Sequence, residues 1–239
     1  MTFSAFAQNN AFMPPPPPPG ETNIPDTWGS RYFHFGLNFT PGIYWVIPNS
    51  SNGMGKGAFA GYGYGANLEF YFTRNYGFLT GFEITTISAR YANSVPNPNP
   101  NAIDSTTTNN ESLQYLQFPL LLKMKTNSFG KIRYYGVVGF EVGFLLKATD
   151  NYNTLVIPNG PYPVSTFMRP YSGNDVNVYD QTDFFRCSLV IGGGFEYSIA
   201  GSTALQASLT YNNCFTNMNS SGSNAANIKG IELMIGILF

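Results

Sequence analysis

Charged side chains are scarce in this sequence. Asp, Glu, Lys and Arg make up 10% of its 239 residues, whereas ordinary soluble domains carry about 25–30%. The formal net charge is −1, so the chain lacks the basic excess that is typical of nucleic-acid binding. The composition therefore departs from that of a soluble domain and gives no reason to expect a nucleic-acid partner.

Long apolar runs are also missing. The mean hydropathy is −0.11, and the sequence contains no stretch of about 18 consecutive apolar residues, the minimum for a transmembrane helix. Helices that cross a membrane are therefore excluded.

Residues that hold metals or attack substrates are few. The chain has one histidine and two cysteines, and it contains no metal-ligand cluster, phosphate-binding loop or dinucleotide fingerprint. We therefore expect no cofactor. Cys187 and Cys214 fall at similar heights on adjacent predicted strands but on opposite sides, so a disulfide would require a bulge or a register shift.

Aromatic residues and glycine are abundant, and apolar residues alternate with small or polar ones. Aromatics reach 16%, and there are 25 glycines. Low charge, many aromatics and period-two alternation without a long apolar run are typical of a membrane β-barrel, in which lipid-facing and lumen-facing residues alternate. A soluble β-sandwich is the alternative, and the evenness of the repeat disfavours it.

The last thirteen residues show the alternation clearly. One face is apolar and ends at the terminal Phe239, and the other carries small residues and Glu232. A period of two predicts a strand. We interpret residues 227–239 as the closing strand of a bacterial outer-membrane barrel, with Glu232 in the lumen.

The first 29 residues form two different segments. Ser4-Ala5-Phe6-Ala7 resembles the end of a secretory signal, so residues 1–7 are interpreted as its remnant and Gln8 as the mature start. Residues 8–29 form a proline-rich tail, predicted to be periplasmic. Its proline run favours a stiff polyproline II spacer, and docking onto an aromatic groove of a partner is the alternative; the run comprises Pro14, Pro15, Pro16, Pro17, Pro18 and Pro19.

Residues 30–239 are predicted to form the barrel itself. Eight strands are expected: one from Arg31, then 58–73, 76–91, 111–125, 131–147, 182–199, 203–215 and 227–239. The connections alternate between long and short, and residues 92–110 and 149–181 are expected to be long loops. An even strand number with this alternation predicts an all-β, antiparallel, up-and-down transmembrane barrel with both termini in the periplasm.

Charged residues on the inner faces are predicted to form an ion-pair network. An eight-stranded barrel is filled by its own side chains, and buried charges there are tolerable only when paired. The sequence contains three Gly-Phe-Glu triplets, which end at Glu83, Glu141 and Glu196. In each triplet, we expect the glycine to leave space inside the barrel, the phenylalanine to face lipid and the glutamate to face the lumen. The predicted lumen network comprises Glu69, Glu83, Lys123, Arg133, Glu141, Lys147, Arg186, Glu196 and Glu232.

Catalysis is weakly supported. His34 is the only histidine, and Ser188, Ser208 and the lumen glutamates are its conceivable companions. Nothing in the spacing selects one of them, although a nucleophile and its base must lie within hydrogen-bond reach. We therefore predict no catalytic site and no enzyme activity, with a lipid-modifying hydrolase as a minor alternative.

The strand at residues 115–123 carries a family resemblance. Its sequence, YLQFPLLLK, is similar to the "YLEIPLLLK" strand of the PorT-like outer-membrane β-barrel family of Bacteroidota, with Gln117 in place of a glutamate. Residues 192–197 and the terminal IGILF are also similar. The resemblance implies an eight-stranded outer-membrane barrel with Phe239 as its insertion signal; the namesake of the family assists type IX protein secretion.

Two functions remain open at this point. The first is a non-enzymatic structural barrel or accessory subunit of an envelope complex, in contact with outer-membrane lipid and with a protein partner in the periplasm or outer membrane. The second is a surface adhesion or ligand-binding barrel that acts through its outer loops. Residues 149–181 are aromatic and amide-rich, which suits such binding; they include Tyr152, Tyr162, Phe167, Tyr171 and Asn174.

Overall fold

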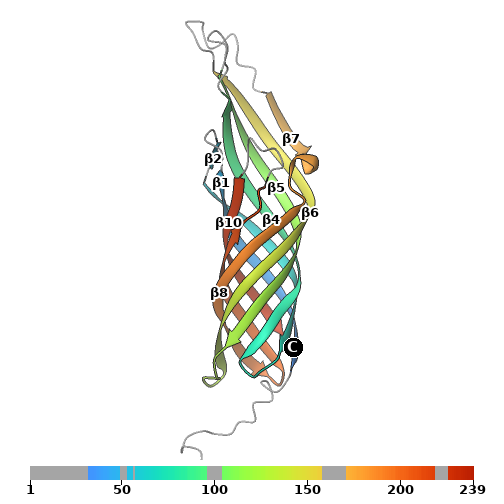
Figure 1. Cartoon of the computed structure of the whole chain (residues 1–239), viewed down its shortest axis with the longest axis vertical. Coiled ribbons are helices and arrows are strands. Elements are labelled where there is room, and N and C mark those ends of the chain that lie inside the picture. The colour runs from blue at the N-terminus through green and yellow to red at the C-terminus, as the bar shows by residue number, and fades with distance from the viewer. Residues whose placement is uncertain (1–31, 49–52, 56, 96–103, 158–170, 219–225) are drawn as a thin grey trace, which may run out of the picture.

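The structure is a tall antiparallel barrel (Figure 1). The computed structural model describes residues 32–48, 53–55, 57–95, 104–157, 171–218 and 226–239. The elements are β1 (Phe33–Pro48), β2 (Gly53–Gly55), β3 (Ala58–Tyr71), β4 (Tyr76–Val95), β5 (Asp104–Lys125), β6 (Ile132–Ile157), β7 (Tyr171–Asn177), the short 3-10 helix η2 (Tyr179–Gln181), β8 (Phe185–Ala200), β9 (Thr203–Cys214) and β10 (Ala226–Leu238).

Eight of these strands close the barrel, as the sequence predicted. The strand order runs β4-β3-β1-β10-β9-β8-β6-β5, and β4 also pairs with β5, which closes the circle. β2 adds to β4, and β7 adds to β6. At the seam between β1 and β10, the backbone N–H of Phe239 donates to the carbonyl of Phe35 at 2.7 Å. The C-terminal residue is therefore part of the closed ladder.

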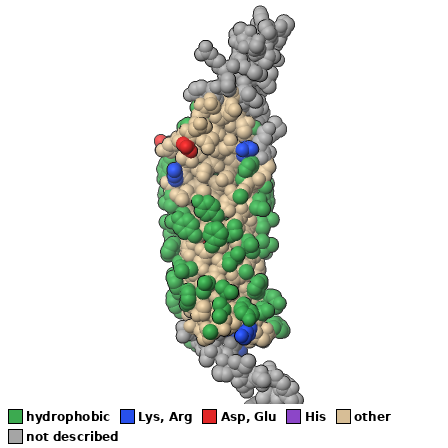
Figure 2. Space-filling model, turned by 180° about the vertical axis from the view of Figure 1, so that it is seen from behind, with side chains coloured by type: hydrophobic (Ala, Val, Ile, Leu, Met, Phe, Trp, Pro, Cys, Tyr) green, Lys and Arg blue, Asp and Glu red, His purple; other side chains and the backbone are tan. Residues whose placement is uncertain are grey.

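Alternation along each strand separates a lipid face from a lumen face. On β1, Phe33, Phe35 and Leu37 are exposed, whereas His34 and Asn38 between them are buried. The other barrel strands repeat this pattern, and Figure 2 shows apolar side chains over the barrel wall with charged side chains only towards its two ends. Except beyond a bulge in β6, the predicted faces agree with the structure, because a period of two assigns every side chain once one position is fixed.

One rim carries the short connections and both ends of the described barrel. The turn after β3 is closed by the N–H of Thr73, which donates to the carbonyl of Tyr76 at 3.2 Å. β6 and β9 likewise begin only a few residues after the strands that precede them. We call this end of the barrel, the lower end in Figure 1, the short-turn rim.

Three strands extend beyond the barrel at the opposite end. β4 continues to Val95, β5 begins at Asp104 and β6 runs to Ile157. Together with β7 they form what we call the projecting sheet: residues 90–95, 104–112, 149–157 and 171–177 (Figure 1). The prediction of loops at 92–110 and 149–181 is therefore wrong for the residues that form the projecting sheet. Thr107 and Thr154 illustrate the reason, because their hydroxyls meet at 3.0 Å across the ladder, and a strand outside lipid needs no apolar face.

Several predictions lie outside the described residues. They include the signal remnant, the tail with Pro14 to Pro19 and the centre of the predicted loops. In the part of the chain that the structure describes, no helix is long and apolar enough to cross a membrane.

Candidate functional site

The lower half of the lumen holds a balanced charge cluster. Lys123 Nζ lies 2.6 Å from Glu69 Oε1 and 2.6 Å from Glu196 Oε1. Lys125 Nζ lies 2.9 Å from the same Glu196 oxygen and 3.6 Å from Glu69 Oε2. All four side chains are buried. Two ammonium groups thus compensate two carboxylates, which is the condition under which buried charges are tolerated.

Aromatic rings surround this lower cluster. Tyr71 donates its hydroxyl hydrogen bond to Glu69, and Lys125 lies 4.1 Å from the centroid of the Tyr71 ring. Lys123 lies 4.0 Å from the centroid of Tyr135. Both contacts are in the range of cation–π interactions. His34 packs edge-on against Tyr71, with 5.5 Å between ring centroids, so the only histidine belongs to this cluster.

An apolar layer separates the lower cluster from a second one. Its members are Leu79, Leu121, Tyr135, Val137 and Val190, all buried. A cavity of about 50 Å³ adjoins this layer and reaches Glu83, Glu141 and Glu232 above it. A space of this size can hold one or two water molecules, so the barrel interior is a packed core.

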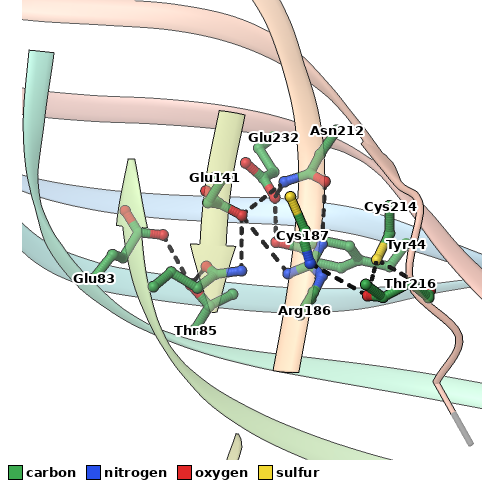
Figure 3. Close-up of polar contacts among 11 residues, drawn as sticks. Tyr44, Glu83, Thr85, Glu141, Arg186, Cys187, Asn212, Cys214, Thr216 and Glu232 are labelled. Atoms are coloured by element: carbon green, nitrogen blue, oxygen red, sulfur yellow. Dashed lines mark hydrogen bonds and ion pairs between the residues drawn. The ribbon is translucent and has the colours of Figure 1, made fainter. Parts of the chain in front are cut away.

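The upper charge cluster has more carboxylates than cations (Figure 3). Arg186 is the guanidinium, and its Nη1 lies 3.8 Å from Glu141 Oε1. Amide side chains complete the site: Gln117 donates to Glu141 at 2.9 Å, and Asn212 donates to Glu141 at 3.0 Å and to Glu232 at 3.4 Å. Hydrogen bonds from neutral donors therefore stabilise carboxylates that one guanidinium cannot neutralise.

Glu83 and Glu232 are held mainly by hydroxyl and amide groups. Glu83 accepts from Thr40 at 2.9 Å, from Thr85 at 3.0 Å and from Asn38. Glu232 accepts from the hydroxyl of Tyr44 at 3.0 Å. With Glu141, these residues place three carboxylates and one guanidinium, Arg186, in the upper cluster, whereas the lower cluster is balanced.

Inner glycines provide the space for these groups, as the sequence suggested. A Cβ at Gly63 would lie 2.1 Å from Glu83 Oε1, and one at Gly61 would lie 2.6 Å from the ring of Tyr44. Real Cβ contacts do not come this close. These strands can therefore carry large inward side chains only because the facing positions have none.

An apolar cap closes the lumen above the upper cluster. Ile87, Leu113 and Leu145 are almost completely buried at its centre. Met218, beyond β9, and Val178, beyond β7, also join it. The backbone N–H of Met218 donates to the carbonyl of Ala226 at 2.7 Å, which holds this residue at the mouth. The described side chains thus fill the interior and seal its upper end.

Most predicted lumen residues lie where the sequence placed them, and one prediction is wrong. Lys147 is exposed on the outer wall. The register passes from Gln114 opposite Lys147 to Tyr115 opposite Leu145, so Leu146 is an extra residue in a β-bulge. A bulge reverses the alternation beyond it. Arg133 is half-buried opposite Glu196 near the short-turn rim.

Two features of the lumen were missed from the sequence. Lys125 belongs to the lower cluster, although its position two residues after Lys123 on the same face was a sufficient signal. The cap was missed as well. Its signal was the presence of Ile87, Leu113 and other apolar residues at inner positions, where the rest of the pattern has small or polar ones.

Two of the candidate catalytic residues lie in different halves of the lumen. His34 lies opposite Glu69 in the lower cluster, whereas Ser188 lies opposite Glu141 in the upper half. Cys187 and Cys214 are free thiols; Cys214 is buried, and Cys187 occupies the alternate face of β8. Within the described ranges, no group of three or more His, Cys, Asp or Glu side chains is arranged to hold a metal ion.

Comparison with known proteins identifies the family. A family model described as "Outer membrane protein beta-barrel domain" matches residues 6–220. The chain therefore belongs to this family of bacterial outer-membrane barrels. Among curated proteins, no sequence matches it.

Solved structures with a similar fold have low sequence identity. Neisserial surface protein A is 11% identical, with 85% of this chain and 95% of that chain covered and a TM-score of 0.40. Ail of Yersinia pestis is 11% identical, with 87% and 100% covered and a TM-score of 0.33. OprG of Pseudomonas aeruginosa is 10% identical, with 85% and 94% covered and a TM-score of 0.35. None of these likenesses carries an argument about the task of this chain.

Proposed function

We propose that this outer-membrane barrel is a non-enzymatic accessory subunit of an envelope complex, and that it binds a protein partner through the projecting sheet. The observation that carries the proposal is the contrast between a filled lumen and an extended sheet beyond the lipid-facing band. A filled eight-stranded barrel offers neither a pore nor a substrate cavity. The projecting sheet, which extends out of the barrel, is therefore the part of the molecule that is available to bind a partner.

The outer face of the projecting sheet suits a specific polar contact. Asn153 is exposed there, between Thr108 of β5 and Ser172 of β7 in the register. Nearby, Arg90 donates to Asn110 and lies 5.0 Å from the centroid of Phe59. The face thus combines amides and hydroxyls with one guanidinium that its neighbours hold in place. Arginine is enriched in protein interfaces.

A secretion-related complex is the specific version that the PorT-like resemblance supports. In that version, the proline run Pro14 to Pro19 is a second contact, on the periplasmic side. The shared position of the short turns, Phe33 and Phe239 at one rim supports both termini being periplasmic. Deleting residues 14–19 should remove a periplasmic crosslink and leave contacts of the projecting sheet in place.

Surface adhesion is the second candidate. It is favoured by the same amide- and hydroxyl-rich face, which also suits hydrogen bonding to sugars. Tyr152 and Asn174 belong to the projecting sheet. Gly173 lies beside the Tyr152 ring, where a Cβ on residue 173 would be 2.6 Å from a ring carbon. The two candidates differ in the partner, which is an envelope protein in one and an external ligand in the other.

Photocrosslinking in native outer membranes tests the proposal. A photoreactive residue at position 153 should give a discrete protein adduct, and the same residue at the exposed Ser128 on the short-turn rim should not give that adduct. Asn153→Arg should abolish co-purification of the partner, while Ser128→Arg, which adds the same charge at the other end, should retain it. Retention of every partner by Asn153→Arg would contradict the role of the sheet.

A further inference from the structure

The bulge in β6 turns a carboxylate towards the inner face of the projecting sheet. Before the bulge, the even-numbered residues of β6 face outward, as the exposed Phe140 does. The register shift at Leu146 reverses the alternation. Asp150 therefore faces inward, where its side chain is buried. Bulges commonly redirect side chains at functional sites, so the surroundings of Asp150 are informative.

A second buried carboxylate lies directly opposite Asp150. It belongs to Glu111 of β5, which is the register partner of Asp150 and is also buried. Residues directly opposite each other on antiparallel strands have Cβ atoms about 4.5–5.5 Å apart. The two negative charges repel each other at this separation. Such a pair weakens the contact between β5 and β6 unless a counter-charge joins it.

The described side chains do not supply this counter-charge. Among the described residues, no ion pair joins either carboxylate to a cationic side chain, because the ion pairs belong to the two lumen clusters. Arg90 and Lys147, on the neighbouring strands, are exposed. The inner positions beside the pair include Ala89 and Ala148, which are apolar. Two carboxylates are therefore buried together without compensation, which is costly.

Two oxygen atoms at this place have no hydrogen-bond donor. They are Asp150 Oδ1 and Asn109 Oδ1, and both atoms are buried. Asn109 precedes Glu111 by two residues on the same face of β5, and the side chain of Tyr91 hydrogen-bonds to both of them. Buried polar atoms nearly always have a partner. The two unpaired oxygens therefore indicate a ligand that binds to oxygen lone pairs.

We propose that Glu111, Asp150 and Asn109 bind a calcium ion at the base of the projecting sheet. Ca²⁺ accepts carboxylate, amide and water oxygens in a flexible arrangement of about six to eight ligands. The ion neutralises the two carboxylates, contacts both unpaired oxygens and links β5 to β6 above the apolar cap, and water completes its shell. Mg²⁺ fits less well, because it requires near-ideal octahedral geometry and loses its own water reluctantly.

Terbium luminescence of the full chain tests the site, because Tb³⁺ replaces Ca²⁺ at oxygen sites and emits when a nearby tyrosine is excited. The protein is refolded from urea into detergent at pH 8 and freed of metal ions. We expect tyrosine-sensitised emission that Ca²⁺ displaces with a dissociation constant of about 0.1–1 mM, as in extracellular calcium sites. Mg²⁺ should be at least roughly tenfold less effective. No displaceable emission, as expected if the carboxylates share a proton instead, or equal displacement by Mg²⁺ would overturn the proposal.

Amide hydrogen exchange gives a second measurement on the wild-type protein. A ligand at ten times its dissociation constant lowers the population of the open form by about tenfold. Calcium at that concentration should therefore slow exchange roughly tenfold in residues 104–112 and 149–157, and exchange near the short-turn rim should stay the same. Unchanged exchange in both ranges would contradict a calcium link between β5 and β6.

Glu111→Gln and Asp150→Asn each remove one charge of the pair and keep the shape of the side chain. Both variants should stay folded, because repulsion is relieved, and both should lose the displaceable emission and the calcium effect on exchange. Asp175→Asn is the matched control. It removes an exposed carboxylate from β7 in the same sheet, and Asn tolerates the φ of 53° at this position. An equal loss in Asp175→Asn, or a full calcium response in Glu111→Gln, would refute the site; heat-modifiable gel migration reports folding of each variant.

Discussion

Replacing Lys123 by methionine should destabilise the barrel strongly, because Lys123 bridges two buried carboxylates. Its Nζ is 2.6 Å from both Glu69 and Glu196, and the side chain is fully buried. Methionine has a similar length and leaves little empty space, so the loss is mainly electrostatic. Lys125 would remain alone between the two carboxylates, at 2.9 Å and 3.6 Å.

The magnitude follows from the cost of a buried charge without compensation. Removing one partner of a buried ion pair typically costs about 3–5 kcal/mol. With a urea m-value of about 2 kcal/mol per molar, this corresponds to a midpoint shift of roughly 1.5–2.5 M. The assay is urea unfolding in detergent micelles or vesicles, followed by the change in gel migration between folded and unfolded protein.

A second variant isolates the electrostatic part. Glu69→Gln combined with Lys123→Met removes one charge of each sign and leaves the Lys125–Glu196 pair at 2.9 Å. The double variant should recover at least half of the lost stability, because the cluster is again balanced. Lys131→Met, at the exposed rim, is the control for loss of a lysine. A midpoint of Lys123→Met within about 0.3 M of the wild-type value would refute a stabilising lumen network.

Three further predictions concern other parts of the barrel. Glu232→Gln should leave the urea unfolding midpoint unchanged or raise it, because the amide oxygen still accepts hydrogen bonds and one of the three carboxylates of the upper cluster is removed. Arg186→Met should lower the midpoint. A lower midpoint for Glu232→Gln would contradict the excess of negative charge in the upper cluster. Gly81→Ala should cost about 2 kcal/mol or more, since Gly81 has a φ of 144° and a Cβ would lie 2.0 Å from the carbonyl oxygen of Ala66; an unchanged denaturation curve would disprove this close approach. Deletion of Phe239 should reduce the amount of barrel in the outer membrane, because it removes a terminal aromatic and the last ladder contact with Phe35; normal membrane levels would argue against its role in insertion.

The sequence predicted the barrel wall well because lipid imposes a strict rule there. Every second residue of a spanning strand must be apolar, and a period of two fixes the face of each neighbour. For this reason Glu69, Glu141 and Glu232 could be placed in the lumen before the structure was known. The projecting sheet was not predicted, because Thr106 to Asn110 lie outside the lipid-facing band and either face can be polar.

The site could be predicted only where alternation is unbroken. Regular alternation predicts Lys147 in the lumen, because it is an even number of residues away from the inward-facing Glu141. The bulge at Leu146 depends on how β5 and β6 fit together, and no local residue preference marks it. Pairing choices were equally hidden. Alternation along the strands shows that Glu83 and Arg186 both face inward. It does not show that hydroxyls and amides, rather than Arg186, hydrogen-bond to Glu83.

The position of the bulge links the lumen to the outer surface. The cap residue Leu145 keeps its inward direction, and Lys147, two positions later, faces outward. If β6 alternated regularly through Leu146, Lys147 would face inward, into the cap that contains Ile87, Leu113 and Met218. The bulge thus keeps the ammonium group of Lys147 out of the cap and on the outer wall. Deleting Leu146 should leave the urea unfolding midpoint close to that of the wild type, because Lys147 would then directly follow the inward Leu145 and would still face outward. A large fall in the midpoint of this variant would show that β5 and β6 need the extra residue for their fit, and would contradict this reasoning.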